Sequence, residues 1–421
     1  MVAVFCEAVF PGLEYALNEV FLRRAGVHWE LLNDPVAFIN HPAACKVNYS
    51  QQDLPGVQIP HSHWLHSAEI DPHFKPPMAL RHGFLCLFPE DAGGGFDLFA
   101  MVFWFLSRYE EYQPFRGDSL GRFSPEDSCI PVEWQGFPLV DMAVNHYLQQ
   151  LGLEPDLKTE TAPTVDIDIA FRFAGRDALR SLGATARDLL KHPDLFGQRV
   201  KAMVSGHDPW DSFPWFVEHM QHLPAARVFW QLHHGRNPHD KQVRIRHPRF
   251  IRRFDEVSQR ITCGMHPSWD SHEIPGQWER EREAFQKLAG HAPVHSRQHF
   301  LRFRFPDTFR RLEQAGIRYD YSMGWPSLPG FRAGTSKPFA FYDLLQQEER
   351  KLVFIPSCIM DVSCRQYQGM DPETAIRTGE LLKTRIAAVG GIFCFIFHNE
   401  SLGEVAPWQG WTKVFEAWMR P

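Results

Sequence analysis

The chain has 421 residues and a formal net charge of −6, from 44 Lys and Arg against 50 Asp and Glu. Its hydrophobic fraction of 44% and charged fraction of 22% are ordinary for a globular protein with a full-sized core. Because the sequence contains no basic block, we do not expect nucleic acid to be its main partner, since neutralising phosphates requires clustered Lys and Arg.

The sequence also argues against a membrane span and a secretory leader. The longest apolar runs, residues 100–106 and 390–397, are too short to cross a bilayer. The N-terminus has no basic segment, and Glu7 interrupts its apolar start. The eight cysteines include no CxxC pair, which favours buried thiols in a reducing compartment. We therefore predict a cytoplasmic protein whose oligomeric state the sequence leaves open.

Residues 1–153 are predicted to form an N-terminal α/β accessory domain of unknown function. Within it, residues 96–112 combine a long apolar run with a polar, aromatic end and predict a buried helix. A loop is expected at 116–131 and a closing helix at 141–153. His61, His63 and His66 have metal-like spacing, but their polar surroundings favour a solvated loop. The polar segment 154–160 is predicted to link this domain to the rest.

After residue 160, predicted strands alternate with predicted helices. Strands are expected at 164–168, 226–232, 261–266, 294–300, 317–322, 351–356 and 392–397, and helices at 248–260, 275–289, 306–315 and 372–389. The last helix is the best marked, because Asp371 is a suitable N-cap, Pro372 fits its first turn and Gly390 ends it. Alternation of this kind predicts an α/β barrel or a doubly wound sheet over residues 161–421.

The stretch Thr164–Asp168 carries two acids on a predicted strand. Because residues i and i+2 of a strand share a face, Asp166 and Asp168 project together. Two close carboxylates repel unless a cation or a shared proton compensates their charge. A metal ion with a general base explains both acids, and capping of the next helix is the alternative from this stretch alone.

Later predicted strands also end in polar residues, where α/β folds gather functional groups. His266 follows one strand, with Asp270 close behind, and is interpreted as a metal ligand rather than a turn residue. Arg297 and His299 share a face of another strand. They form either part of the site, or a salt bridge with the first acids and a packed histidine.

Three further residues are candidates with open alternatives. Asp320 fits a structural turn and a catalytic acid equally well. His398 follows an apolar strand, and we favour a ring that faces a cavity over one bonded within the core. Trp325 either walls a substrate site or packs in the core. Taken together, the polar strand ends predict an active site.

Five short motifs in this order resemble those of the NodB-homology polysaccharide deacetylases, the carbohydrate esterase family 4 type. The matching segments are Thr164–Asp168, His266–Asp270, Arg297–His299, Asp320–Trp325 and Phe395–His398. A divergent bacterial branch of that superfamily, with an uncharacterised N-terminal domain, is similar over nearly the full length. The strings that carry this likeness are Ser107–Tyr112, Ser296–His299, Asp320–Gly324, Gly330–Gly334 and Phe397–Glu400. The resemblance implies a distorted (β/α) barrel at 161–421.

The chain departs from the family pattern at three positions. Ile167 separates two acids that are usually adjacent, and Asp270 stands where a second metal-binding histidine is usual. His299 stands where the family has proline. Either Asp270 or His299 completes the metal site, and we prefer His299 because nitrogen ligands suit zinc.

The resemblance implies a metal-dependent hydrolase that removes an N-acetyl group from an acetylated amino sugar or related glycan, in cell-surface polysaccharide metabolism. We expect a divalent metal, with zinc favoured, on Asp168, His266 and His299. The expected catalytic residues are Asp166 as general base, Arg297 as its partner and His398 as general acid.

Arg332 in its Gly-flanked loop and Trp325 are the expected substrate contacts. The expected partner is a small-molecule or glycan substrate. Two alternatives remain. One is hydrolysis of a non-sugar amide on the same fold, and the other is a non-catalytic carbohydrate-binding protein with a degenerate metal site.

Overall fold

The computed structural model describes residues 1–67, 69–91, 94–175, 193–233, 235 and 237–420. Its larger part is built on a nine-stranded sheet with the order β12-β13-β11-β10-β9-β8-β7-β15-β14. The strands are β7 (Thr159–Ile167), β8 (Arg227–Trp230), β9 (Thr262–Met265), β10 (His295–Ser296), β11 (Tyr319–Asp320), β12 (Phe339–Asp343), β13 (Glu348–Phe354), β14 (Ile359–Met360) and β15 (Gly391–His398).

Every neighbouring pair in this sheet is parallel except β12 and β13, which are antiparallel. The predicted α/β class with a parallel sheet is therefore confirmed. The expected distorted (β/α) barrel does not close, because β12 and β14 end the order and do not pair with each other in the described part of the chain. At one edge β12 folds back antiparallel on β13, and at the other edge β14 has only two residues.

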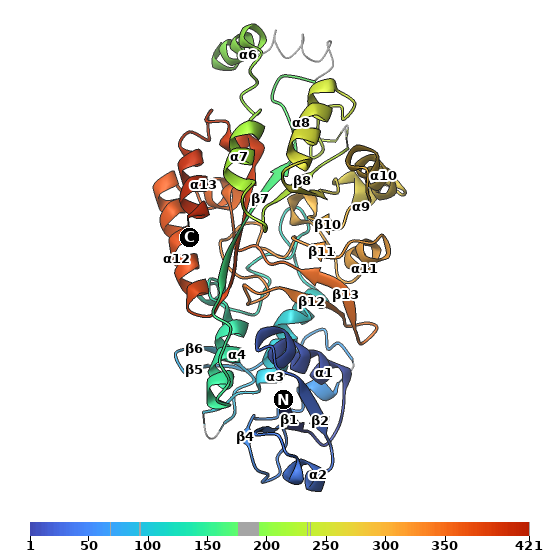
Figure 1. Cartoon of the computed structure of the whole chain (residues 1–421), viewed down its shortest axis with the longest axis vertical. Helices are drawn as coiled ribbons and strands as arrows, with labels where there is room; N and C mark the ends of the chain where they lie inside the picture. Colours follow the sequence, from blue (N-terminus) through green and yellow to red (C-terminus); the bar gives the residue numbers. More distant parts are fainter. Residues whose placement is uncertain (68, 92–93, 176–192, 234, 236, 421) are drawn as a thin grey trace.

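Helices flank the sheet (Figure 1). They are α7 (Phe213–Met220), α8 (Pro248–Ser258), α9 (Asp270–Glu273), α10 (Gln277–Ala289), α11 (Asp307–Gln314), α12 (Pro372–Ala387) and α13 (Trp411–Met419). The helix α6 (Pro193–Ser205) lies apart from the sheet, at the end of the molecule opposite the N-terminal region. As expected, Asp371 caps α12 by accepting a hydrogen bond from Thr374 N at 2.8 Å. Gly379 lets α13 approach closely, because a Cβ there would lie 2.3 Å from Trp418 Nε1.

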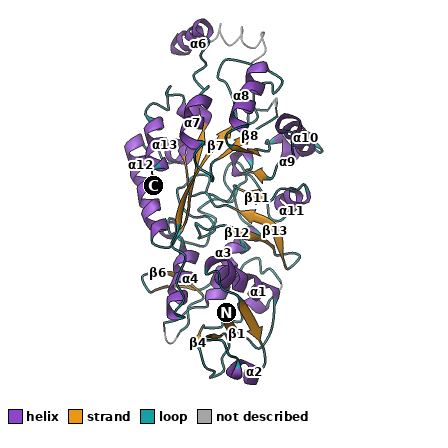
Figure 2. Cartoon of the chain, in the orientation of Figure 1, coloured by secondary structure: helices purple, strands orange, loops and turns teal. Residues whose placement is uncertain are grey.

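The N-terminal region forms a smaller unit at one end of the molecule (Figures 1 and 2). Its parallel sheet has the order β2-β1-β3-β4, from β1 (Val2–Phe5), β2 (Trp29–Leu32), β3 (Cys45–Asn48) and β4 (Val57–Gln58). The other elements are α1 (Pro11–Leu17), a π-helix (Asn18–Arg24), α2 (Pro35–Asn40), the hairpin β5 (Met78–Arg81) and β6 (Phe84–Leu87), α3 (Leu98–Leu106) and α4 (Leu139–Gln150). The predicted buried helix corresponds to α3, whose nine residues are all buried.

Buried polar contacts join this region to the larger sheet. Tyr15 Oη donates a 2.8 Å hydrogen bond to the carbonyl oxygen of Ala340. Asp141 accepts hydrogen bonds from the Thr335 hydroxyl at 2.7 Å and from Ser336 N at 2.8 Å. β7 begins at Thr159, inside the predicted linker. The two regions therefore share a continuous interface rather than meeting through a flexible connection.

All eight cysteines are free thiols, and six of them are buried. Among the helices that the structure describes, none combines the length and the apolar composition needed to cross a bilayer.

Candidate active site

A cavity of about 400 Å³ lies where β7, β9, β10 and β15 end. Parallel strands place their carboxyl ends along one edge, which brings residues distant in sequence together. In register, His398 of β15 pairs with Asp166 of β7, and Ser296 of β10 pairs with Met265 of β9. The residues lining the cavity include Asp166, Asp168, His266, His299, Phe300, Tyr367 and His398.

Asp168, His266 and His299 meet at one point of this cavity. Their potential ligand atoms all lie within 4.8 Å of one another. His266 Nε2 is 3.1 Å from Asp168 Oδ1, and His299 Nε2 is 3.4 Å from Asp168 Oδ2. Asp168 directly follows β7, His266 follows β9, and His299 opens a short turn after β10. The three strand ends thus bring together the residues that the sequence predicts as metal ligands.

The outer hydrogen bonds of both histidines show how this cluster fits a cation. His266 Nδ1 lies 2.7 Å from the carbonyl oxygen of Arg297, so that nitrogen must carry a proton and donate. His299 Nδ1 likewise faces Asp240 Oδ1 at 3.3 Å. In the neutral rings, both Nε2 lone pairs then point at the Asp168 carboxylate. Acceptors facing acceptors require a positive charge between them, and the donor set suits zinc.

The raised pKa of His299 also indicates that this cluster favours a positive charge. Burial lowers the pKa of His299, but the Asp168 and Asp240 carboxylates outweigh it and raise that pKa to about 9. Burial raises the pKa of Asp168, while the charges of His299 and His398 lower it well below its usual range. Without a metal ion, a proton on His299 therefore compensates the carboxylates.

Asp166 is held beside this cluster by a buried arginine. Arg297 Nη1 donates to Asp166 Oδ1 at 2.7 Å and to the Thr164 hydroxyl at 2.8 Å, and Arg297 Nε donates to the carbonyl of Tyr321 at 3.0 Å. The guanidinium also stacks 4.6 Å from the centre of the Phe229 ring. The other carboxylate oxygen, Asp166 Oδ2, lies 3.8 Å from His266 Nε2 and faces the cluster. Arg297 thus fixes the position of the Asp166 carboxyl group on the cavity wall.

His398 reaches the cavity from the end of β15. Its Nδ1 lies 2.9 Å from Asp361 Oδ1, and its Nε2 lies 3.6 Å from Asp168 Oδ2. Burial lowers the pKa of His398, but Asp361 and Asp168 raise it well above 6.5. Next to it, burial raises the pKa of Glu400 to about 7. His398 therefore favours its protonated form beside the cluster.

The two residues left open by the sequence occupy different places. His299 lies in the cluster, whereas Asp270 accepts hydrogen bonds from His233 Nε2 at 2.9 Å and Asn237 Nδ2 at 2.6 Å. Asp240 lies between them and accepts hydrogen bonds from the backbone nitrogens of Trp269 and Asp270, both at 2.9 Å. Asp270 thus braces the loop behind His299.

Arg332 and Trp325 lie away from this cavity, which corrects their predicted role as substrate contacts. Arg332 is buried and makes two hydrogen bonds with Glu111, at 2.9 and 2.6 Å. Trp325 is buried against Phe123, with nearly parallel rings 6.0 Å apart. The carboxylate of Glu111 therefore already pairs with the Arg332 guanidinium, which was expected to bind substrate. Glu111 is 221 residues away, so no local pattern could indicate the pairing.

Asp320, which fitted a structural turn and a catalytic acid equally well, has a structural role. The carboxylate is buried and accepts hydrogen bonds from the Ser296 hydroxyl at 2.6 Å and from Ser322 N at 2.9 Å. It thereby joins the ends of β10 and β11 and does not line the cavity.

Several cavity residues escaped the sequence analysis. Arg122 comes from the N-terminal region, donates to the carbonyl of Phe300 at 2.7 Å and to the Tyr367 hydroxyl at 3.0 Å, and lines the cavity. Asp240 and Asp361 support His299 and His398 from behind. Arg122 lies in an ordinary polar loop, so its sequence context did not indicate a role at the site.

Comparison with known proteins gives distant likenesses. A family of unknown function, DUF7033, has a model that matches residues 2–153. No curated protein matches the chain.

Three solved structures share a similar arrangement. A candidate polysaccharide deacetylase from Mycobacterium smegmatis has 15% identity and a TM-score of 0.40, over 62% of this chain and 84% of that one. A second, from Pseudomonas aeruginosa PAO1, has 10% identity and a TM-score of 0.39, over 62% and 83%. Puue allantoinase has 10% identity and a TM-score of 0.38, over 63% and 85%. These likenesses are too distant to assign an activity to the chain.

Proposed function

We propose that this protein is a metal-dependent hydrolase that removes the acetyl group from an N-acetylated amino sugar or related glycan. The observation that carries the proposal is the convergence of Asp168, His266 and His299 beside the Asp166–Arg297 pair. The motif resemblance to NodB-homology deacetylases adds to it, because each of these residues stands in one of the five motifs.

Asp168, His266 and His299 would hold a divalent ion, with zinc suited to the two imidazole nitrogens. When bound, such an ion polarises the amide carbonyl and makes the attacking water more acidic. Three protein ligands leave room for substrate and water on the cavity side. The hydrogen bonds from His266 Nδ1 to a backbone carbonyl and from His299 Nδ1 to Asp240 fix both rings for this task.

Asp166 acts as the general base. Its Oδ1 is bound to Arg297, which orients the carboxylate, and its Oδ2 is turned toward the ion site to accept a proton from the attacking water. His398 acts as the general acid. Asp361 holds its Nδ1, so Nε2 presents a proton toward the space where the amide nitrogen leaves.

The cavity has the size and lining expected for one or two sugar rings. Its 400 Å³ is bounded by aromatic side chains, of which Phe300 and Tyr367 offer faces on which a sugar ring can stack. Lys241 adds positive charge to the wall, whereas the guanidinium of Arg122 is paired with Asp118. A glycan carrying a carboxylate or phosphate close to its acetamido group fits this combination.

The decisive experiment measures acetate release by purified, zinc-loaded protein from a panel of substrates. The panel contains N-acetylglucosamine oligomers, nucleotide-linked acetamido sugars and cyclic amides. We expect acetate from at least one acetamido sugar, and no acetate from the Asp168→Asn variant. Turnover of the cyclic amides alone would replace the sugar substrate with a non-sugar amide. Binding of acetamido sugars without any turnover by the zinc-loaded protein would contradict a hydrolase.

A further inference from the structure

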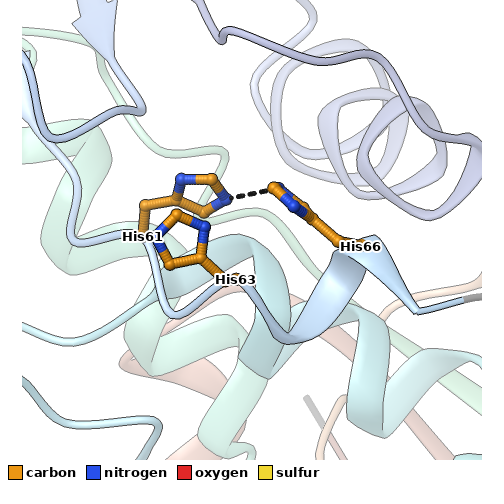
Figure 3. Close-up of side chains that lie close together, drawn as sticks. All are labelled: His61, His63 and His66. Atoms are coloured by element: carbon orange, nitrogen blue, oxygen red, sulfur yellow. Dashed lines mark hydrogen bonds between the residues drawn. The ribbon is translucent and has the colours of Figure 1, made fainter.

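A second group of histidines lies far from the cavity, in the N-terminal region. His61, His63 and His66 bring their ring nitrogens within 4.8 Å of one another (Figure 3). His61 Nε2 and His66 Nε2 are 3.0 Å apart, and the ring centres of His61 and His63 are 4.2 Å apart. The three residues follow β4 in the loop that leads through a short 3-10 helix (Trp64–His66). The solvated loop expected from the sequence is thus an ordered cluster of three imidazoles.

From this geometry we propose that His61, His63 and His66 form a second binding site for a divalent transition-metal ion, zinc being the natural occupant. Two nitrogens that bind one tetrahedral zinc ion at about 2.0–2.1 Å lie roughly 3.3 Å from each other. The 3.0 Å between the Nε2 atoms of His61 and His66 is already close to that value. Small ring rotations bring the third nitrogen to the same point.

The loop is held in this shape by contacts outside the three rings. Asp97, fully buried at the start of α3, accepts hydrogen bonds from Ser62 N at 2.9 Å and from the Ser62 hydroxyl at 2.7 Å. The Tyr49 hydroxyl also donates to Asp97, and the Tyr49 ring lies 4.3 Å from that of His61. The histidines on either side of Ser62 therefore keep their places without a metal ion.

The backbone at His63 carries a further sign of constraint. Its φ is +60°, a left-handed conformation that side-chain-bearing residues rarely adopt. This turn places the His63 ring beside the His61 ring (Figure 3). Strained backbone of this kind concentrates at binding and active sites, because the surrounding structure must hold it in place.

The surroundings also define the kind of site. His63 and His66 are exposed, whereas His61 is partly buried. Three nitrogen ligands on the surface leave a coordination position open to water or to a donor from another molecule. Imidazole ligands select zinc, copper or nickel over magnesium and calcium, which prefer oxygen. The site is independent of the proposed hydrolase chemistry, because none of its residues lines the active-site cavity.

The test uses full-length protein whose cavity site has been disabled by Asp168→Asn and His299→Gln. Zinc is titrated alone and followed by calorimetry, and the coordination is read from the absorption bands of Co²⁺. We expect one equivalent of zinc with a micromolar or tighter Kd. Adding His63→Gln and His66→Gln should weaken binding at least 100-fold and remove the cobalt bands. A matched control replaces His28 and His73, two exposed histidines of the same region, and should bind as before.

Circular dichroism of each variant checks that the fold is kept, and acetate release by the His63→Gln/His66→Gln variant with an intact cavity should equal that of the wild type. Zinc binding unchanged by the His63 and His66 substitutions, or equally weakened by the control pair, would overturn the proposal. Failure of the hydrolase proposal would leave this result untouched, since the titration needs no substrate.

Discussion

The two histidine clusters differ in the contacts that hold the imidazole rings in place. In the cavity, both ligand histidines are buried and each Nδ1 is held, by the Arg297 carbonyl for His266 and by Asp240 for His299. In the N-terminal cluster, His61 and His66 contact each other through their Nε2 atoms, and two of the three side chains are exposed. Support from behind fixes the ring, its tautomer and its basicity. We therefore expect tighter metal binding in the cavity.

The largest expected effect on activity comes from replacing Asp166, the proposed general base beside the cavity cluster. Asp166→Asn should lower kcat by roughly 10²–10⁴-fold, because the amide cannot accept the proton of the attacking water. Zinc content, measured by mass spectrometry, should stay the same, since Asp166 is not among the three ligands. Asp168→Asn is the matched variant and should lose both zinc and turnover. Full activity in Asp166→Asn would remove Asp166 as the base.

The next largest effect is expected from Asp240, the carboxylate that contacts the proposed metal ligand His299. Asp240→Asn should weaken zinc binding in the cavity about 10–100-fold, because the carboxylate that orients His299 is lost. Asp361→Asn is the comparison, since it supports His398 and no proposed ligand. It should lower kcat while the zinc Kd stays unchanged. Equal zinc affinities for the two variants, measured by competition with a chelator, would show that Asp240 has no part in positioning His299.

Site residues could be predicted from the sequence where their position follows from the residues next to them along the chain. Asp166 and Asp168 were predictable because strand alternation puts them on one face, and His266 and His398 because they follow strands. His299 was predicted from a strand face shared with Arg297, but β10 ends at Ser296 and His299 lies in the turn that follows. Arg332 was not predictable, because its partner Glu111 lies on the far side of the interface between the two regions.

The fold likewise combines elements that local sequence patterns predict with features that they do not. Where the local signals are strong, the helix is predicted closely, as for α12, which ends two residues before its predicted end. The helix predicted at 96–112 is α3, which is shorter and ends at Leu106. The strands β10 and β11 have only two residues each, so the segments predicted at 294–300 and 317–322 were too long. The sheet order depends on which strand reaches which neighbour, and alternation of strands and helices does not encode whether the ends meet.

A moderate effect tests whether the N-terminal region takes part in the cavity. Arg122→Gln should raise KM about tenfold, because the loop at Phe300 and the Tyr367 ring lose a charged donor. Zinc content and kcat should change little. Arg116→Gln, an exposed arginine of the same loop, serves as the control and should behave as wild type. Unchanged KM in both variants would separate the N-terminal region from catalysis.

The smallest effect concerns stability. Burial lowers the pKa of His295 on β10 from its ordinary 6.5 to about 4. The unfolded chain therefore binds a proton between pH 6.5 and 4 that the folded protein does not, and the free energy of unfolding falls as the pH falls through this window. His295→Gln should flatten the slope of urea-unfolding free energy against pH from 6.5 to 4. A slope identical to that of the wild type would exclude His295 as a source of acid sensitivity.

The central claim is that Asp168, His266 and His299 share one ion at the ends of β7, β9 and β10. A crystal of the full chain soaked in zinc, with anomalous scattering recorded on both sides of the zinc edge, tests it directly. We expect a peak with Asp168, His266 Nε2 and His299 Nε2 each about 2.0–2.2 Å away. A fully loaded crystal with zinc elsewhere, and these three side chains turned into separate hydrogen bonds, would contradict the account.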